Sequence, residues 1–122
     1  MMDIEAVRLY CLSFPMTTEG FPFDETTLVF KVAGKMFALI GLDSPDPTIN
    51  LKCDPFAALE WRERYPEDVL PGWHMNKRHW NTVRLEGNLT SRQLQDMIGH
   101  SYDLVVKGLP KKLQANIRRP DS

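Results

Sequence analysis

The segment that runs from residue 77 to residue 84 holds the side chains best suited to bind a charged partner. It reads Lys-Arg-His-Trp-Asn-Thr-Val-Arg, so cations stand on both sides of a tryptophan. In a β-strand alternate residues share a face, which would place Trp80 and Arg84 opposite the apolar Val83. An exposed aromatic ring beside cations can stack on a nucleobase while the cations neutralise phosphate. The competing interpretation, which spacing alone favours, is that Trp80 packs under a helix or against Trp73, because tryptophans are mostly buried.

Charge is distributed unevenly along the chain. The 122 residues carry a net charge of −1, which argues against a strongly electrostatic nucleic-acid binder. Residues 1–61 hold four basic and nine acidic side chains, whereas residues 62–122 hold eleven basic and seven acidic ones. The basic excess of the second half indicates a binding face, and pairing of charges between the two halves explains it equally well.

The sequence contains no recognisable arrangement for catalysis or metal binding. No Gly-x-Ser-x-Gly turn, phosphate-binding glycine loop, Cys-x-x-Cys pair or His-Glu-x-x-His helix occurs. His74 and His79 are five residues apart across an expected turn and form a weak metal pair, since catalytic zinc needs three protein ligands. We therefore predict no catalytic residue, no metal site, no cofactor and no enzymatic activity. The carboxylates around the middle helix are predicted to form a solvated face: Glu60, Glu63, Glu67 and Asp68.

Length and composition predict one globular domain over residues 1–122. The chain is 43% hydrophobic and 25% charged, as expected of a protein with a packed core. Its N-terminus lacks the basic-then-apolar order of a signal peptide, and no apolar run approaches the twenty or so residues of a membrane-spanning helix. We therefore expect a cytoplasmic protein with no membrane partner. Cys11 and Cys53 are predicted to be buried, reduced thiols.

Hydrophobic periodicity and turn residues predict an α+β order of elements. Expected strands cover residues 27–32, 35–42, 48–53 and 79–86, with Ala33-Gly34 as a tight hairpin turn. Expected helices start after the N-cap residues Asp3, Asp54 and Thr90, and stop at Phe14-Pro15, Pro66 and Gly108. Turns are expected at 71–72 and 76–78, and a basic, frayed tail at 111–122. This order predicts an antiparallel sheet with an N-terminal and a C-terminal helix packed on it.

Several blocks of the sequence form a familiar set. They are Phe21-Pro-Phe-Asp-Glu-Thr-Thr-Leu-Val-Phe-Lys-Val, Gly34-Lys-Met-Phe-Ala-Leu-Ile, Leu51-Lys-Cys-Asp-Pro, Pro71-Gly-Trp-His-Met-Asn-Lys-Arg-His-Trp-Asn-Thr-Val, Ser101-Tyr-Asp-Leu-Val-Val and Leu109-Pro-Lys-Lys. On these blocks, which span nearly the whole chain, the protein resembles the MmcQ/YjbR family of small bacterial proteins. The resemblance implies a frataxin-like (CyaY-like) fold with a double-wing arrangement.

The same resemblance implies DNA binding. The family positions present here are Lys77, His79, Trp80, Ser101 and Tyr102. Frataxin-like proteins can bind iron through an acidic first helix, but the first helix here has only Asp3 and Glu5, so iron binding is not expected. Fold does not dictate function, so the functional argument depends on the residues.

The favoured hypothesis is a non-enzymatic bacterial protein that binds DNA weakly and without sequence preference, as a monomer or a weak homo-oligomer. The predicted nucleic-acid-binding residues are Lys77, Arg78, His79, Trp80, Arg84, Lys111 and Lys112, with Arg118 and Arg119 as further phosphate contacts in the tail. The alternative is a protein-interaction or small-ligand-binding module that uses the same tryptophan-rich surface. A clustered basic face would favour the first hypothesis, and an apolar groove around Trp73 and Trp80 the second.

Overall fold

Short segments with alternating burial pair into one antiparallel sheet. The structure is a computed structural model that describes residues 2–72 and 75–117. In chain order the elements are α1 (Ile4–Leu12), β1 (Thr17–Gly20), β2 (Thr27–Val32), β3 (Lys35–Gly41), β4 (Thr48–Lys52), α2 (Pro55–Arg64), β5 (Val69–Pro71), β6 (Trp80–Arg84), α3 (Ser91–Lys107) and α4 (Lys111–Gln114). The strands lie side by side in the order β1-β2-β3-β4-β6-β5, and every neighbouring pair is antiparallel.

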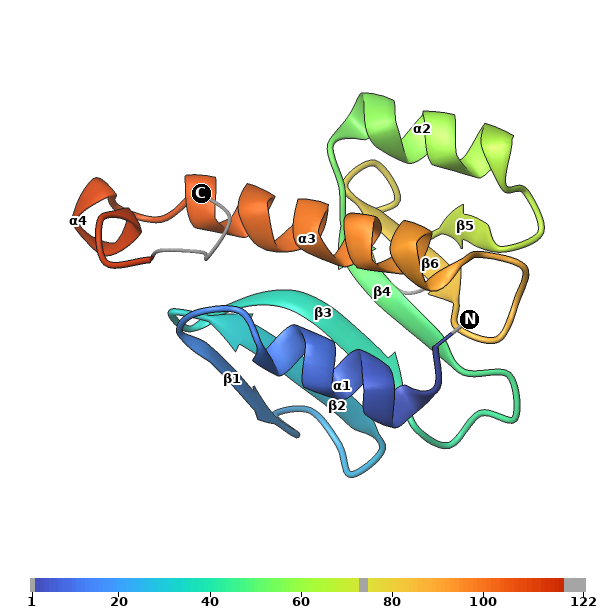
Figure 1. Cartoon of the computed structure of the whole chain (residues 1–122), viewed down its shortest axis with the longest axis horizontal. Helices are drawn as coiled ribbons and strands as arrows, with labels where there is room; N and C mark the ends of the chain where they lie inside the picture. The colour runs from blue at the N-terminus through green and yellow to red at the C-terminus, as the bar shows by residue number, and fades with distance from the viewer. Residues whose placement is uncertain (1, 73–74, 118–122) are drawn as a thin grey trace.

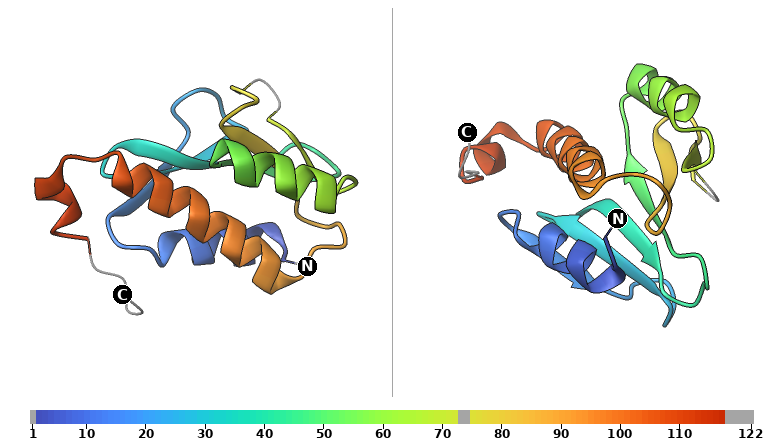
Figure 2. Two further views of the ribbon diagram at one scale, coloured as in Figure 1. Left: turned by 90° about the horizontal axis from the view of Figure 1, so that it is seen from above. Right: turned by 45° about the vertical axis from the view of Figure 1, so that its right-hand side comes forward.

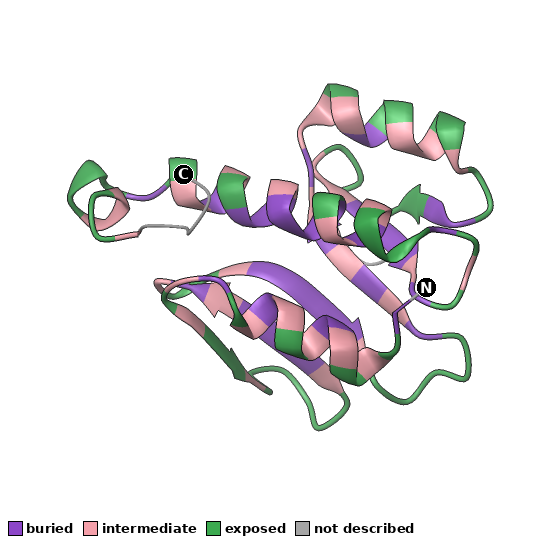
Figure 3. Cartoon of the chain, viewed as in Figure 1, coloured by how far each residue is buried: buried purple, intermediate pink, exposed green. Residues whose placement is uncertain are grey.

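Helices α1, α2 and α3 pack on one face of this sheet (Figures 1 and 2). Arg8 of α1 donates hydrogen bonds from Nε and Nη2 to the carboxylate of Glu19 in β1. Arg62 of α2 donates from Nε to Asn81 Oδ1 at 2.7 Å, and Asn81 shares its face of β6 with the buried Val83. The burial pattern agrees, because buried residues gather on β3, on β4 and on the inner side of α3 (Figure 3).

Aromatic packing joins the segment after α1 to β3 and α3. The rings of Phe14 and Tyr102 stack with their centroids 4.6 Å apart, and Phe37 meets both rings edge-on. The Tyr102 hydroxyl donates a hydrogen bond to the carbonyl of Pro15 at 2.6 Å. Tyr102, one of the family positions, is therefore fully buried and ties α3 to the end of α1.

The sheet opens between β3 and β4. Their ladder runs from Ile40–Ile49 to Ala38–Leu51, and the next pair in register would be Phe37 and Lys52. There the buried Ser101 hydroxyl of α3 donates to the Phe37 carbonyl (2.5 Å) and accepts from the Lys52 amide (2.8 Å). One hydroxyl therefore replaces a strand-to-strand hydrogen bond. Figure 2 shows the result: β1, β2 and β3 form one half and β4, β6 and β5 the other, with α3 lying over the opening.

Most elements expected from the sequence are confirmed, including the α+β class and the packing of the terminal helices on an antiparallel sheet. Asp3, Asp54 and Thr90 are N-cap residues, and Thr90 with Gln93 forms a complete capping box. The Ala33-Gly34 hairpin is present, with positive φ at both residues. Cys11 and Cys53 are free and buried.

Three expectations were wrong in detail. β1 was not predicted, because its sequence Thr-Thr-Glu-Gly has little apolar pattern. β5 was not predicted, because Pro71 is typical of a turn although here it ends an edge strand. The strand expected over 79–86 is shorter, Trp80–Arg84. The first part of the tail is helical rather than frayed, because the Gln114 amide donates to the carbonyls of Lys107 and Leu109 and closes α4 against α3. Residues 118–122, with Arg118 and Arg119, lie outside the described residues.

Candidate nucleic-acid interface

Lys77 and Arg78 lie together on the turn before β6, as the sequence predicted. The Arg78 amide donates to Asn76 Oδ1 at 2.9 Å, and Lys77 Nζ donates to the Gly72 carbonyl at 3.2 Å. Both side chains face α2 across a groove of about 460 Å³. The groove is lined by Pro55, Phe56, Leu59, Arg62, Lys77 and Arg78. The exposed aromatic side chain beside these cations is therefore Phe56 of α2, which is distant in sequence from the basic turn and was not predicted.

His79 and Trp80 are half-buried and hold the start of β6 in place. The Cys53 amide donates to the His79 carbonyl at 2.7 Å, and the Gly72 amide donates to the Trp80 carbonyl at 2.9 Å. A Cβ added at Gly72 would lie 2.8 Å from the Trp80 Cβ, so only glycine fits against this tryptophan. The Cα partner of Trp80 across the ladder is Lys52, which keeps Trp80 on the face opposite Val83, as predicted.

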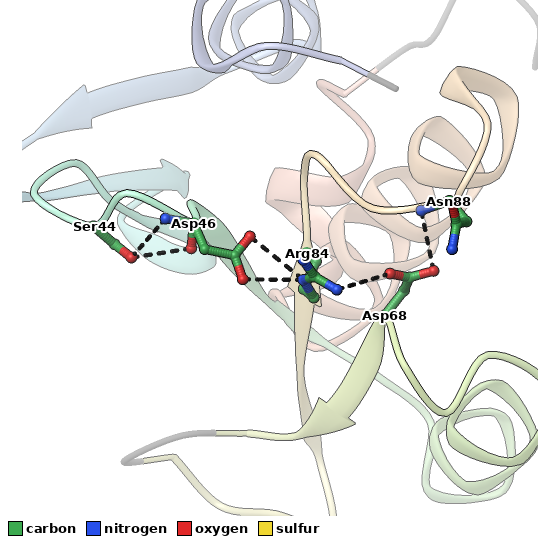
Figure 4. A network of polar contacts seen from close by, with 5 residues as sticks. All are labelled: Ser44, Asp46, Asp68, Arg84 and Asn88. Atoms are coloured by element: carbon green, nitrogen blue, oxygen red, sulfur yellow. Dashed lines mark hydrogen bonds and ion pairs between the residues drawn. The ribbon is translucent and has the colours of Figure 1, made fainter.

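Arg84 lies apart from Lys77 and Arg78 and is surrounded by carboxylates (Figure 4). Its Nε is 3.0 Å from Asp46 Oδ2, and its Nη1 is 3.7 Å from Asp68 Oδ1. Asp68 also accepts a hydrogen bond from the Asn88 amide at 3.2 Å. Two carboxylates neutralise this guanidinium, so the structure does not bring Arg84 into a basic patch with the turn.

Asp68 corrects another expectation, since it is only 4% exposed rather than part of a solvated face. Its carboxylate is packed so closely that a Cβ on Gly87 would lie 2.0 Å from Oδ1. Glu60, Glu63 and Glu67 are exposed, as predicted. The difference arises because Asp68 directly precedes β5, where the chain turns into the sheet.

A group of five lysines, called the lysine cluster below, surrounds the C-terminal end of α3. It consists of Lys35, Lys52, Lys107, Lys111 and Lys112. Lys35 and Lys52 line a cavity of about 270 Å³ where β3 and β4 separate, together with Met36, Leu104, Val105 and Gly108. Lys107 is the last residue of α3. Lys111 and Lys112 begin α4, and the Gln114 side chain holds α4 against the same end of α3. No ion pair involving these five lysines is present among residues 2–72 and 75–117.

The predicted site is therefore divided. Lys77 and Arg78 lie beside α2, whereas Lys111 and Lys112 lie at the far end of α3 on α4 (Figure 1). Lys35, Lys52 and Lys107 were missed because they are isolated cations in the sequence, and only the pairing of β3 with β4 under α3 brings them together. Lys35 begins β3 and Lys52 ends β4, and in an antiparallel pair these two ends lie next to each other. The positions of these two lysines are the signal that could have indicated the cluster.

The other family position on α3, Ser101, has the bridging role described above and no access to solvent. Its neighbour His100 accepts a hydrogen bond at Nε2 from the Asp54 amide at 3.2 Å and meets the Trp61 ring edge-on. Burial lowers the pKa of His100, which keeps the imidazole neutral and able to accept this bond. Burial raises the pKa of Cys11 and of Cys53 to about 12, so neither thiol is poised as a nucleophile.

The described part of the chain has neither a cluster of metal ligands nor a membrane-spanning helix. Within residues 2–72 and 75–117 no three His, Cys, Asp or Glu side chains are arranged to hold a metal ion. His74 and Trp73 lie outside the described residues, so the His74–His79 pair and the contact of Trp73 with Trp80 are not tested. None of the described helices is long and apolar enough to cross a membrane.

Comparison with known proteins agrees with the sequence resemblance. The chain is 38% identical over 114 residues to YbdF of Escherichia coli O157:H7, covering 93% of each protein. It is 32% identical over 111 residues to YjbR of Escherichia coli K12, covering 91% of this chain and 93% of that one. Both relatives are described as uncharacterized proteins. The crystal structure of Deinococcus radiodurans DR2400, a DUF419 domain, superposes with a TM-score of 0.90 at 38% identity over 100% of this chain and 92% of that one. The family model described as YjbR matches residues 12–104, and the chain therefore belongs to the YjbR family.

Proposed function

We propose that this protein binds nucleic acid weakly and without sequence preference in the bacterial cytoplasm, and that the lysine cluster supplies the phosphate contacts. The observation that carries the proposal is the gathering of five lysines from β3, β4, α3 and α4 around one end of α3, with no ion pair to any of them in the described part of the chain. Ammonium groups without partners keep their full attraction for phosphate. The protein acts in this proposal as a binding module and not as an enzyme.

The shape of the cluster suits a phosphate backbone. Lys35 and Lys52 stand on the two strands that separate beneath α3, and α4 adds Lys111 and Lys112 farther along the same end. A row of cations from different elements can follow successive phosphates without reading bases, which gives affinity but no sequence preference. In this proposal base stacking falls to Trp80, which is half-buried and is the ladder partner of Lys52.

The affinity should be modest. The net charge of the chain is −1, so the attraction comes from one end of the molecule and not from its overall charge. Non-specific binders typically have dissociation constants of about 10⁻⁴–10⁻⁶ M at physiological salt. The slope of log affinity against log salt on duplex DNA should approach roughly −4.5 if all five lysines contact phosphates, at about −0.9 per contact.

The test is a salt titration of binding to single-stranded and duplex oligonucleotides, followed by fluorescence anisotropy. The double variant Lys35→Gln/Lys52→Gln should weaken binding and reduce the magnitude of the slope by about two contacts. Arg92→Gln is the matched control, because it removes one exposed cation at the opposite end of α3 and should leave binding unchanged. Absence of binding to either oligonucleotide at low salt, or equal losses in the two variants, would contradict the proposal.

A further inference from the structure

The outer side of β1, called the β1 edge below, is unpaired. β1 is the end strand of the sheet, and no other described segment pairs with its outer side (Figure 1). The Ala33 amide donates to the Met16 carbonyl, so these two residues form a hydrogen-bonded pair, and such pairs alternate along an antiparallel ladder. The amide and carbonyl of Thr18 therefore face β2, whereas those of Thr17 and Glu19 point outwards.

The β1 edge lacks the usual protection of an exposed strand. At the opposite end of the sheet β5 ends in Pro71, which has no amide to offer to a partner. β1 contains no proline and no lysine, and both carboxylate oxygens of its single charged residue, Glu19, accept hydrogen bonds from Arg8 of the same chain. Main-chain donors and acceptors left open in this way accept another strand.

The strand that fits this edge is short. Pro15 and Pro22 flank β1 and have no amides, and at Met16 the backbone turns out of the strand with a φ of 59°. Thr17 and Glu19 are therefore the residues of this edge that offer both an amide and a carbonyl. A longer segment of another protein gains no further hydrogen bonds beyond them. The strand that matches the edge in length and in the spacing of its groups is β1 itself.

We propose that the β1 edge pairs antiparallel with the β1 edge of a second copy of this chain. A two-fold axis between the two Thr18 residues, perpendicular to the sheet, sets Thr17 of each copy opposite Glu19 of the other. Every outward amide then meets an outward carbonyl, and the two sheets become one. The register is selected, because an axis centred on Glu19 instead would oppose two carboxylates, whereas opposed threonines stabilise a strand pair.

The residues beside β1 suit this register. Met16 is 45% exposed and Phe21 is 50% exposed, so both ends of the β1 edge carry an exposed apolar side chain. The pairing sets Met16 of each copy opposite Gly20 of the other. A Cβ added at Gly20 would have no neighbour within 4 Å, which leaves room there for the incoming methionine. Apolar contacts therefore close both ends of the new ladder.

The contact is short, so the dimer is weak and forms at high protein concentration. Stable interfaces bury about 1,200–2,000 Å² in total, more than a strand of 4 residues and its flanks provide. A net charge of −1 per chain gives little repulsion between the two copies. The proposal concerns a different surface from the lysine cluster and does not depend on nucleic-acid binding.

The first test is a disulfide at the two-fold axis. The two Thr18 residues form a non-hydrogen-bonded pair with a Cα–Cα distance of about 4.5 Å, which a disulfide can span. Thr18→Cys should therefore give a covalent dimer in a buffer with oxidised glutathione. Glu19→Cys is the matched control, because its two copies are diagonal neighbours more than about 7 Å apart, too far for a disulfide. Cys11 and Cys53 are buried and are the same background in both variants.

The second test is sedimentation equilibrium over a wide concentration range. The wild type should show a reversible increase in mass towards that of a dimer. Glu19→Pro removes an outward amide and no ladder bond to β2, and it should weaken self-association at least about tenfold. Glu19→Gln loses the same charge but keeps the amide, and should associate like the wild type. Equal melting temperatures of these two variants show that the proline leaves the fold intact.

A charge at the axis repeats the test without a change in the backbone. Thr18→Lys sets two ammonium groups opposite each other and should weaken self-association at least about tenfold. Asn88→Lys adds the same cation at an exposed position after β6, on the other half of the sheet, and should leave self-association unchanged. The proposal is overturned if the wild type stays monomeric at the highest concentration, if the two lysine variants associate equally, or if Thr18→Cys forms no more covalent dimer than Glu19→Cys.

Discussion

The lysine cluster and the groove beside α2 both contain several cations, but their surroundings differ. Around the lysines lie a cavity and the end of a helix, with no carboxylate in the cavity lining. Arg62, Lys77 and Arg78 line an apolar groove, and the exposed side of α2 next to it carries Glu60, Glu63 and Arg64. A cavity lined by cations and no acids attracts an extended polyanion, whereas cations beside apolar and acidic side chains have less excess charge to offer it. The number of cations in a segment therefore says less about function than the charges next to them.

The largest expected effect is on the connection that supports the lysine cluster. Ser101→Ala should lower the free energy of unfolding by about 2–5 kcal/mol, because it leaves the buried Phe37 carbonyl and Lys52 amide without partners. Chemical denaturation measures the loss. Lys35 and Lys52 stand on the two strands that Ser101 joins, so nucleic-acid affinity should fall while self-association through the β1 edge persists.

Ser13→Ala is the control for this prediction. Ser13 is exposed and its hydroxyl donates to one backbone carbonyl, that of Tyr10. Its removal should change stability by no more than about 0.5 kcal/mol. Equal losses in the two serine variants would mean that the bridge between β3 and β4 has no special role.

Monovalent salt should weaken binding at the lysine cluster and at the β1 edge to different extents. Raising monovalent salt from about 50 to 200 mM should weaken nucleic-acid binding by roughly 10²–10³-fold if five phosphates are contacted. Self-association should change by less than about tenfold, because the main-chain hydrogen bonds and apolar contacts between two β1 edges carry no net charge for salt to screen. Anisotropy and sedimentation on the same samples give both numbers. Parallel salt dependences would remove the distinction between the surfaces.

The fold was predictable where local signals decide the structure. The capping box at Thr90, the Asp54-Pro55 helix start and the Ala33-Gly34 hairpin depend on residues within a few positions of one another. The short edge strands β1 and β5 carry no such signal and owe their pairing to β2 and β6. Strand identity could therefore be inferred for the centre of the sheet and not for its edges.

The candidate site was less predictable, because its charges come from distant segments. Arg84 is neutralised by Asp46 of the loop before β4 and by Asp68 before β5, which strand alternation does not indicate. Lys35 and Lys52 meet only because β3 and β4 pair and then separate. The turn with Lys77 and Arg78 was predicted, yet its aromatic neighbour Phe56 comes from another element. Long-range pairing, rather than residue type, decides which cations remain available.

A smaller effect is expected at the other end of α3. Thr90→Ala removes the acceptor for the Gln93 amide and should cost about 1 kcal/mol of stability. Both surfaces should keep their function, since the lysine cluster lies at the opposite end of the helix and β1 is a separate element. Thermal denaturation, anisotropy and sedimentation test this together. A loss of nucleic-acid binding in Thr90→Ala would show that the cluster responds to stability alone.

The smallest expected effect is a pH dependence that reaches α2 through His100. Its Nε2 accepts from the Asp54 amide at the N-cap of α2, and a protonated imidazole cannot accept that bond. Burial lowers the folded-state pKa; the nearby carboxylates of Asp54 and Asp103 oppose this shift, and Lys107 adds to it. The unfolded chain, with an ordinary pKa of about 6.5, then takes up the proton first as pH falls.

Well above pH 6.5, His100 should not affect the free energy of unfolding. As pH falls from 6.5 towards the folded-state pKa of His100, the free energy of unfolding should decline, and below that pKa it should become constant again. His100→Gln keeps a possible acceptor but does not titrate, so the wild type should lose more stability than this variant between about pH 7.5 and 5.5. Because the bond holds the first turn of α2 and not β1, self-association should differ little between the two proteins over the same interval. Nucleic-acid binding, corrected for ionic strength, should differ little between the two proteins. If His100→Gln follows the wild type in stability through this pH range, the hydrogen bond to Asp54 does not stabilise α2.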